Sequence, residues 1–532
     1  MKHFKISLLA AAAVVTLTAM PSLAATPKSM LVVAERIDDI ISLDPAQSFE
    51  FTGNEIDRNL YSFLINTSPL DLDAGYGPDL ASSWEVSEDG MTITFKIAEG
   101  RKFASGNPIT AQDAAFSLQR VILLNKTPSF ILSQFGFTPE NVKEKIVATD
   151  DTTLSITTDK PYAVSFVLNC LTANVAAIVD SKLTMENEVD GDMGNAWLRN
   201  HSAGSGAYTL KSLKPNESVI LVANPNWWGE APAMKQIFVR QVAESASQRL
   251  LLEKGDVDVA RNLSTEDVAA VSESDDIKIH SELRGRIMYW SANQKNEILS
   301  NPKVLEALKY LTDYNGMADS FLKGQYSVHQ AFLPLTYLGA LEDNPYSLDI
   351  EKGKALLAEA GYPDGFEINA IVREVQERID IAQSLQNTWG KAGVKLSITV
   401  GTGAQTLDKY RAREHDIYIG AWGPDYPDPN TNAGTFALNP GNADDAGNTG
   451  YLAWRNAWDI PEYSKRTLAA VVENDVEKRK QMYIDLQKEF QQVSPFGIMF
   501  QQTEQAALRS NVDNFSIGGA ITTTSYWQVT KD

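Results

Sequence analysis

A short segment in the C-terminal third, IGAWGPDYPDPNTN at residues 419–432, combines a tryptophan, a tyrosine, three prolines and two aspartates. A carboxylate such as Asp425 can bind a cationic group, and the rings of Trp422 and Tyr426 can form flat apolar walls around a ligand. The prolines restrict the backbone and so reduce the entropy lost on binding. Asp428 stands before another proline, which is typical of a turn. The segment has no evident catalytic partner, so it predicts a site where a ligand is held and not transformed.

The common catalytic and cofactor-binding motifs are missing. The sequence has no GxxxxGK[ST] phosphate loop and no HExxH zinc motif. GTGAQT at 401–406 is an incomplete dinucleotide pattern that follows a predicted strand without opening a clear helix, and AGSGAY around Ser205 lacks the first glycine of a nucleophile elbow. Four scattered histidines and one cysteine after residue 24 disfavour a zinc site. We expect a binding protein without catalytic residues, cofactor or metal. A secreted hydrolase with a carboxylate pair is the alternative from another class, because such pairs leave little trace.

Length and composition indicate an exported globular protein of several domains. A chain of 532 residues exceeds one compact core, and a hydrophobic content of 43% with mixed charge is typical of a folded protein. The formal net charge of −21 disfavours nucleic acid and anionic lipid as partners. Cys170 is the only cysteine, so no internal disulfide can form, which suits a bacterial periplasm.

The first 24 residues have the pattern of a secretory signal peptide. Lys2 and Lys5 precede an apolar run that ends at Pro21, and a small-x-small site follows, with cleavage expected after Ala24. The apolar run is short for a membrane anchor, which needs about 20 residues. No cysteine stands at the cleavage site, so we expect a periplasmic protein that is not a lipoprotein.

The rest of the chain alternates strand and helix patterns, which predicts an α/β or mixed fold with more than one lobe. Predicted strands have apolar residues at every second position or short apolar runs, and predicted helices have caps and a 3.6-residue period. Strands are expected at 91–97, 217–223, 366–372 and 394–400, a hairpin at 146–158, and helices at 349–361, 377–393 and 475–495. The strand, helix and strand from 366 to 400 predict a parallel pair with a crossover.

Five segments in order resemble the bacterial extracellular solute-binding proteins of family 5, the dipeptide- and oligopeptide-binding components of ABC importers. They are 78–120, 204–229, 244–260, 349–368 and 422–429. Most individual residues in these segments could equally be turn or core residues of any fold. The resemblance depends on the order of the five segments along nearly the whole chain.

The resemblance implies a two-lobed periplasmic-binding-protein fold of the Venus-flytrap kind, with an extra domain inserted in the first lobe. The first lobe is expected to contain 25–62, 201–285 and 506–532. The inserted domain is expected at 63–200 and the second lobe at 286–505. Two crossings near residues 285 and 505 would then form the hinge.

The resemblance also implies roles for particular residues. Asp425 is expected to bind the amino end of a peptide, with Trp422 and Tyr426 as walls. Arg373 is expected to bind the carboxyl end, because a guanidinium matches a carboxylate. The loop at 42–53 resembles the family segment that lies along the ligand, so its candidates are Phe49, Glu50 and Phe51. The alternatives are turn or core roles for Asp425 and Trp422, a surface ion pair of Arg373 with Glu374 or Glu377, and lobe packing for the loop.

One departure from the family pattern leaves the ligand class open. Where relatives often have FNT, this chain has MYWSANQKNEILSNPKV at 288–304, so Trp290 and Asn293 are candidates to alter the cleft. Members of the family also bind oligosaccharides, opine-like conjugates and nickel chelates. Residues 421–440 contain no histidine, which counts against a metal, whereas Trp422, Trp454 and Trp458 could stack on sugars.

The predicted function is therefore that of a periplasmic substrate-binding protein, a monomer that captures short peptides by lobe closure. It would deliver them to an ABC permease powered by an ATPase, touching the membrane only through that complex. A sugar or a sugar–amino acid conjugate is the alternative ligand in the same fold.

Overall fold

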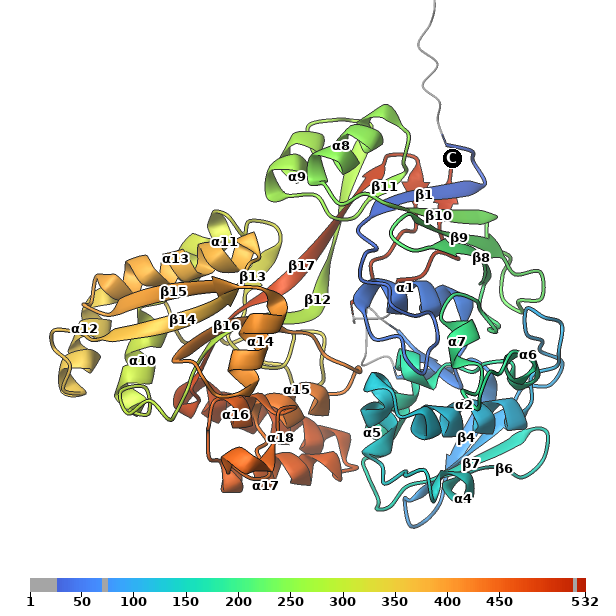
Figure 1. Ribbon diagram of the computed structural model, residues 1–532, viewed down its shortest axis with the longest axis horizontal. Helices are drawn as coiled ribbons and strands as arrows, with labels where there is room; N and C mark the ends of the chain where they lie inside the picture. The colour runs from blue at the N-terminus through green and yellow to red at the C-terminus, as the bar shows by residue number, and fades with distance from the viewer. Residues whose placement is uncertain (1–25, 69–74, 520–523) are drawn as a thin grey trace, which may run out of the picture.

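The computed structural model describes residues 26–68, 75–519 and 524–532. The predicted signal peptide, residues 1–24, lies outside the described residues. Two lobes of mixed α/β structure lie on either side of two long strands, β12 (Ile277–Ala292) and β17 (Phe496–Arg509) (Figure 1). We call the lobe that carries β1 and the small sheet the first lobe, and the lobe that carries β14 and β16 the second lobe.

One sheet of eleven strands runs through both lobes, and β12 and β17 are neighbouring strands within it. In order, the sheet contains β15 (Lys395–Gly401), β14 (Glu367–Arg373), β16 (Ile417–Trp422), β12, β17, β11 (Val259–Ala260), β1 (Met30–Glu35), β10 (Gln236–Gln241), β9 (Ser218–Ala223) and β8 (Tyr208–Lys214), with β13 (Tyr326–Val328) beside β17. The antiparallel register of β12 and β17 is interrupted between Leu283 and Ile287. Both lobes are thus built on the same two strands.

The first lobe has a second sheet of its own. This small antiparallel sheet has the order β4 (Ala81–Val86), β5 (Thr92–Ile97), β7 (Thr153–Thr157) and β6 (Ile146–Ala148). It covers a separate apolar core with α2 (Ala111–Leu124), whose Thr110 and Asp113 form a capping box. The predicted strand at 91–97 and the hairpin at 146–158 are confirmed as β5 and as β6 with β7.

The remaining elements of the first lobe are mostly short. Its helices are α1 (Phe51–Leu60), α3 (Phe130–Ser133), α4 (Val142–Lys145), α5 (Val164–Leu171), α6 (Ser181–Glu186), α7 (Asn195–Leu198), α8 (Ser245–Lys254) and α9 (Thr265–Val271). Two strand pairs complete the chain, β2 (Ile65–Thr67) with β3 (Tyr76–Pro78) and β18 (Val512–Asp513) with β19 (Thr530–Lys531).

The second lobe contains the predicted parallel pair with its crossover helix. β14 and β15 are parallel from the Glu367–Lys395 pair to the Arg373–Gly401 pair, and α13 (Gln376–Gly390) connects them. Ile381, Leu385 and Trp389 recur along one face of α13 and are fully buried. The prediction of a strand, helix and strand is confirmed.

The other helices of the second lobe surround this unit (Figure 1). They are α10 (Pro302–Tyr310), α11 (Tyr314–Asp319), α12 (Ile350–Glu359), α14 (Gly403–Arg411), α15 (Asn430–Phe436), α16 (Leu452–Arg455), α17 (Pro461–Val471) and α18 (Val476–Val493). Asp349 caps α12 by accepting a hydrogen bond from the Lys352 amide at 2.9 Å. The expectation that GTGAQT opens no helix is wrong, because Thr402 and Gln405 form a capping box that begins α14 there.

The two lobes also touch below the cleft, where α5 meets the segment before α15. Arg479 of α18 forms a bidentate ion pair with Asp428, at 2.8 and 2.9 Å, and both side chains are buried. The amide nitrogen of the Asn169 side chain, on α5, donates to the same carboxylate at 3.1 Å. Asp428 also accepts from the Asn430 amide at 2.8 Å, which confirms its predicted turn role. The buried Asp428 carboxylate therefore bonds to the turn before α15, to α18 and to α5 of the first lobe.

Replacing Arg479 with methionine should destabilise the protein strongly. It would leave the Asp428 carboxylate buried without its cation, a change that costs about 3–5 kcal/mol. Denaturant unfolding followed by circular dichroism measures this loss. The matched control is Arg466→Met, which breaks the exposed pair with Glu489 and should change stability by less than about 1 kcal/mol. Equal effects of the two substitutions would contradict the assignment of Arg479 and Asp428 as a buried anchor.

Candidate ligand-binding cleft

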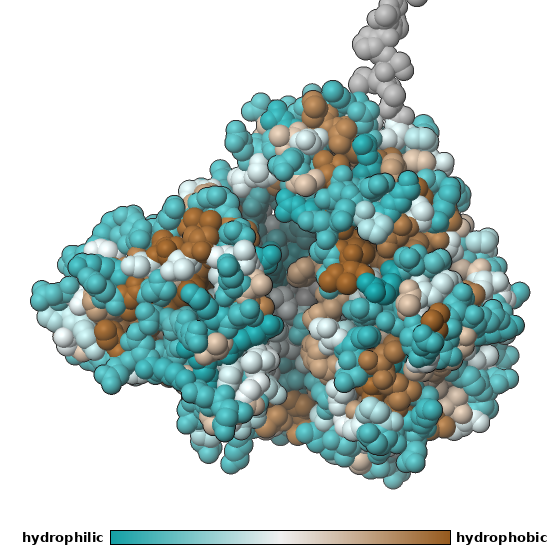
Figure 2. Space-filling model, in the orientation of Figure 1, coloured by the Kyte–Doolittle hydropathy of each residue, from teal (hydrophilic) through white to brown (hydrophobic). Residues whose placement is uncertain are grey.

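A cavity of about 640 Å³ lies between the two lobes, next to β12 and β17. Figure 2 shows this hollow as a recess between the lobes. Half of the residues that line it are charged: the acids are Glu35, Asp38, Asp39, Glu55, Glu377 and Glu504, and the bases are Arg36, Arg261, Arg284, Arg286 and Arg373. A cavity of this size suits a small ligand, and its charged wall favours a ligand that carries charges of its own.

Two of the predicted site residues line this cavity from opposite lobes. Arg373 ends β14, is exposed, and forms no hydrogen bond or ion pair with the part of the chain that is described. The predicted alternative, an ion pair with Glu377, is not formed, because Glu377 pairs with Arg286 at 3.3 Å. Phe51 begins α1 and is 51% exposed, an unusual position for a large apolar side chain. Both side chains are available to a ligand.

Asp425 lies in the loop after β16 and is not itself among the residues that line the cavity. A Cβ atom on the cavity-lining Gly285 would come within 2.8 Å of the Pro424 side chain, so the loop is seated directly against the cavity wall. The Asp425 amide donates to the Thr431 hydroxyl at 2.9 Å. Its carboxylate has no hydrogen bond or ion pair among the described residues, and burial raises its pKa to about 7. A desolvated carboxylate without a partner is a candidate site for a cation.

The aromatic residues of the same loop have different surroundings. Tyr426 is buried at the contact between the lobes, with its ring 5.8 Å from that of Phe166 on α5, and it is not in the cavity wall. Trp422 is half-buried, and its indole nitrogen is buried without a hydrogen-bond partner in the described chain. The structure thus places Tyr426 in packing and leaves a free N–H donor on Trp422.

The other two residues of the predicted first-lobe loop pack locally. The Glu50 carboxylate accepts a hydrogen bond from the Phe49 amide at 3.3 Å, and Glu50 precedes the first turn of α1. The Phe49 ring packs edge-on against Phe130 at 5.9 Å. Neither residue is among those that line the cavity.

The tryptophans considered for sugar stacking or for altering the cleft lie in the core of the second lobe. Trp290 is fully buried, and Trp454 is 3% exposed with its indole nitrogen donating to the Ala443 carbonyl at 3.0 Å. The Trp458 ring packs against Phe490 at 5.7 Å. Asn293 is also buried and donates to two backbone carbonyls. None of these four side chains lines the cavity, so the proposed alteration of the cleft by Trp290 and Asn293 is not seen.

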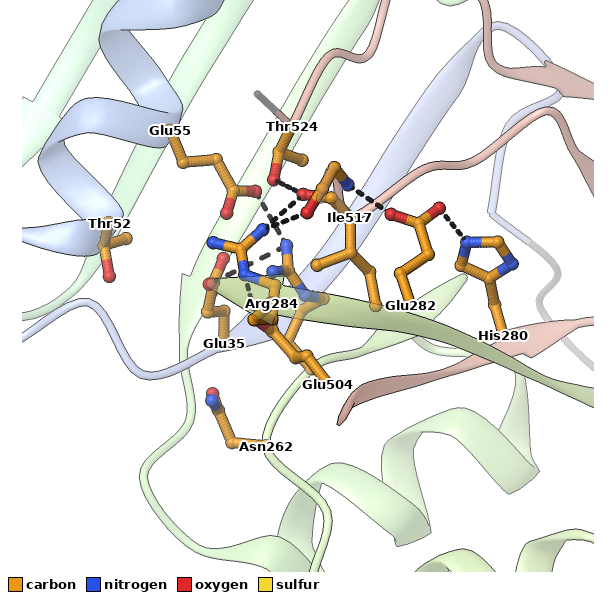
Figure 3. Close-up of polar contacts among 12 residues, drawn as sticks. Glu35, Thr52, Glu55, Asn262, His280, Glu282, Arg284, Glu504, Ile517 and Thr524 are labelled. Carbon is orange, nitrogen blue, oxygen red and sulfur yellow. Dashed lines mark hydrogen bonds and ion pairs between the residues drawn. The ribbon is translucent and has the colours of Figure 1, made fainter. Parts of the chain in front are cut away.

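A cluster of ion pairs at the first-lobe end of the cavity was missed in the sequence. Arg261 forms ion pairs with Glu55 and Glu504, both at 2.7 Å, and Arg284 reaches Glu504 at 3.2 Å (Figure 3). Burial followed by the Glu55 charge raises the pKa of Glu35 well above its usual range. Burial alone would also raise the pKa of Glu504, but Arg284 and Arg261 outweigh it and lower that pKa. The available signal was a charged residue directly after an apolar run, as in MLVVAE and VDVAR.

The same cluster fixes the C-terminal segment to β12. Arg284 donates to the carbonyls of Ile517 and Gly518 at 2.8 and 2.6 Å. Glu282 accepts from the Gly518 amide at 2.5 Å and contacts His280, also at 2.5 Å (Figure 3). These contacts hold the end of β12 that belongs to the first lobe.

Among the described residues, no group of three or more histidine, cysteine, aspartate or glutamate side chains could hold a metal ion. In the same part of the chain, no helix is long and apolar enough to cross a membrane.

Comparisons with known proteins agree on one family and one fold. A family model described as bacterial extracellular solute-binding proteins, family 5 Middle, matches residues 75–444. The probable D,D-dipeptide-binding periplasmic protein DdpA of Escherichia coli (strain K12) is 28% identical over 499 residues, 92% of each chain. The periplasmic binding protein DppA of Helicobacter pylori in complex with the peptide STSA superimposes with a TM-score of 0.77 at 21% identity, over 94% of this chain and 98% of that one.

A further solved structure holds a different kind of ligand. The protein AgaA of A. tumefacien R10 in complex with agropinic acid has a TM-score of 0.73 at 19% identity, over 94% of this chain and 99% of that one. Likeness at such identities shows a shared fold. The predicted two-lobed α/β architecture is thereby confirmed.

Replacing Asp425 with asparagine should stabilise the ligand-free protein at alkaline pH. The pKa of Asp425 is about 7 in the folded protein and about 3.9 in an unfolded chain. Between these values the folded state binds a proton that the unfolded state does not, so wild-type stability falls as the pH rises from about 4 to about 7. Asparagine has no such dependence.

We expect a higher Tm for Asp425→Asn than for wild type at pH 8, and a smaller difference at pH 4.5. Differential scanning calorimetry of ligand-free protein measures both. The control is Asp445→Asn at an exposed aspartate, which should leave the Tm unchanged. A variant less stable than wild type at pH 8 would show that the Asp425 carboxylate is paired within the protein.

Proposed function

Because the chain belongs to family 5 of the bacterial extracellular solute-binding proteins, we propose that it captures short peptides in the periplasm for an ABC importer. It performs no chemistry, works as a monomer, and passes its ligand to a membrane permease powered by an ATPase. The observation that carries the proposal is the unpaired, desolvated carboxylate of Asp425 beside a cavity with arginines in its wall. A peptide brings the two charges that such a site lacks, an ammonium group and a carboxylate.

The ligand amino group is assigned to Asp425 and its terminal carboxylate to Arg373. A buried charge without a counter-ion is costly, so an ion pair at Asp425 relieves a penalty already present in the ligand-free protein. Arg373 is exposed and carries no such penalty. The free N–H of Trp422 can donate to a peptide carbonyl. Phe51 can cover the ligand from the first lobe, where its exposed ring would lose contact with water.

Lobe closure is the proposed response to the ligand. Within the first lobe, we assign residues 25–62, 201–285 and 506–532 to the lobe proper and residues 63–200 to the inserted domain, which carries the small sheet. The second lobe is assigned to residues 286–505. The hinge is placed where the register of β12 and β17 is interrupted, between Leu283 and Ile287. A ligand that contacts both lobes binds the closed form better, and so shifts the population toward it.

Native mass spectrometry of the purified protein, followed by denaturing release and fragmentation, tests the ligand class. We expect short peptides to co-purify with wild type and to be lost from Asp425→Ala, because the buried ammonium group would have no counter-ion. Asp445→Ala, at an exposed aspartate, is the matched control and should retain them. A single species without a peptide bond would replace the peptide assignment by an opine-like conjugate. A chemically altered product would favour a hydrolase.

Peptide binding should release a proton at pH 6. Asp425 is largely protonated at that pH, since burial raises its pKa to about 7. The ligand ammonium group favours the ionised carboxylate, so the proton leaves as the peptide binds. Isothermal titration calorimetry in two buffers of different ionisation enthalpy measures this release, which should approach one proton for Ala-Ala with wild type. Binding of Ala-Ala without proton release would place its amino group elsewhere.

A further inference from the structure

Three arginines gather around the start of α13, at the second-lobe side of the cavity. Arg286 and Arg373 line the cavity, and so do Val375 and Glu377 at the beginning of the helix. Arg378 is the next residue of the helix. Its guanidinium lies close enough to Arg286 and Glu377 for both charges to affect its pKa. Four of these five residues line the cavity, and Arg378 follows Glu377 without being among the lining residues. We call the five residues the α13 patch.

Arg378 is the exceptional member of the α13 patch. It is only 8% exposed, and its Nε atom is buried with no hydrogen-bond partner among the described residues. No hydrogen bond or ion pair joins its guanidinium to any part of the described chain. Burial and the nearby Arg286 charge lower its pKa. A charged side chain is seldom buried unless it is paired.

The charges of the α13 patch do not balance. Glu377 is its only acid, and that carboxylate is already engaged by Arg286 at 3.3 Å and by the Tyr326 hydroxyl at 3.2 Å. The patch thus contains one carboxylate and three guanidinium groups. The arginines of the neighbouring cluster, Arg261 and Arg284, have their own partners in Glu55 and Glu504 and do not alter this balance.

The helix itself adds to the positive potential. α13 has 15 residues, and its N-cap, Val375, supplies no side-chain oxygen to the first turn. The first amide groups of a helix carry partial positive charge and favour anions. The α13 patch therefore combines a helix N-terminus with two arginines, Arg373 and Arg378, that have no counter-ion in the described part of the chain. Of these two, Arg373 lines the cavity.

We propose that the α13 patch binds a second carboxylate of the ligand, so that the preferred ligand carries one amine and two carboxylates. This inference rests on the proposed function, in which Asp425 binds the amine and Arg373 the terminal carboxylate. A ligand with one carboxylate leaves one of the two unpaired guanidinium groups without an anion. A ligand with two neutralises both. The peptide class that meets this requirement is a short peptide with a C-terminal glutamate or aspartate.

The test compares two peptides that differ in one charge. Ala-Glu and Ala-Gln have nearly the same shape, and isothermal titration calorimetry gives the Kd of each. A hydrogen-bonded ion pair favours Ala-Glu by about 10- to 100-fold for wild type. In Arg378→Met the preference should fall to within about threefold, mainly through weaker binding of Ala-Glu. Equal affinities for wild type, or a preference retained in the variant, would overturn the proposal.

The same titrations separate this inference from the proposed function. If neither peptide binds wild type, peptide capture itself is wrong. If both bind equally, peptide capture stands and the second carboxylate site is wrong. N-(1-carboxyethyl)phenylalanine, an amine with two carboxylates and no peptide bond, is the third ligand. Tighter binding of this conjugate than of Ala-Glu would overturn the acidic peptide as the source of the second carboxylate.

The Tm of the ligand-free protein distinguishes a ligand-binding role of Arg378 from a structural role, because the two roles predict opposite changes in Tm on substitution. Removing an unpaired buried charge should leave the Tm of ligand-free Arg378→Met equal to or above that of wild type. Arg413→Met is the matched control in the same lobe, because Arg413 is 6% exposed but pairs with Asp444 at 2.7 Å. It should lower the Tm and leave the ratio of the two Kd values unchanged. A lower Tm for both Arg378→Met and Arg378→Gln would show that Arg378 stabilises the fold, against the proposal.

Discussion

The pairing of β12 with β17 is the constraint on which the rest of the structure depends. The two strands pair from Ile277 with Arg509 to Ser291 with Phe496, and one end of the pair belongs to each lobe. Within this pairing the register breaks between Leu283 and Ile287, and Arg284 and Gly285 occupy the break. Arg284 is held on the first-lobe side, whereas Gly285 has room for no side chain against Pro424 of the second lobe. The loop that carries Asp425 is therefore in direct contact with the segment proposed as the hinge.

Charged groups in the cleft fall into two sets with opposite energetic roles. The paired set, around Arg261 and Glu504, is internally satisfied and keeps the frame of the cleft in place. The unpaired set contains Asp425 and Arg378, which are desolvated without counter-ions and so make the ligand-free state less stable than it could be. Both unpaired groups belong to the second lobe. Under the proposed function, a ligand would therefore find its counter-ions on the second lobe, and the first lobe would close over it.

Local sequence patterns predicted the helices and strands well, but predicted less well which side chains surround each residue in the folded protein. The crossover around α13 and the cap at Asp349 depend on residues a few positions apart, so the sequence contains the whole signal. The helical spacing of Met482, Leu486, Phe490 and Val493 predicts that all four lie on one apolar face. Val493 is nevertheless 47% exposed, because α18 ends there and the chain turns into β17. Loop composition and family resemblance predicted Asp425 as a ligand contact, and that role stays a prediction, since Asp425 is not among the residues that line the cavity. The unpaired state of Arg378 could not be predicted, because it depends on which distant side chains fail to reach it.

The loop with two aspartates links ligand capture to contact between the lobes. Asp428 is satisfied by Arg479 and receives a hydrogen bond from Asn169 of the first lobe, whereas Asp425, three residues earlier, is unsatisfied. Prolines around both aspartates keep their relative position nearly fixed. A ligand that pulls on Asp425 therefore acts on the same rigid segment that carries the contact between the lobes. Under the proposed function, closure would need no separate relay, because the same loop contacts Gly285 of β12 through Pro424 and Asn169 of the first lobe through Asp428.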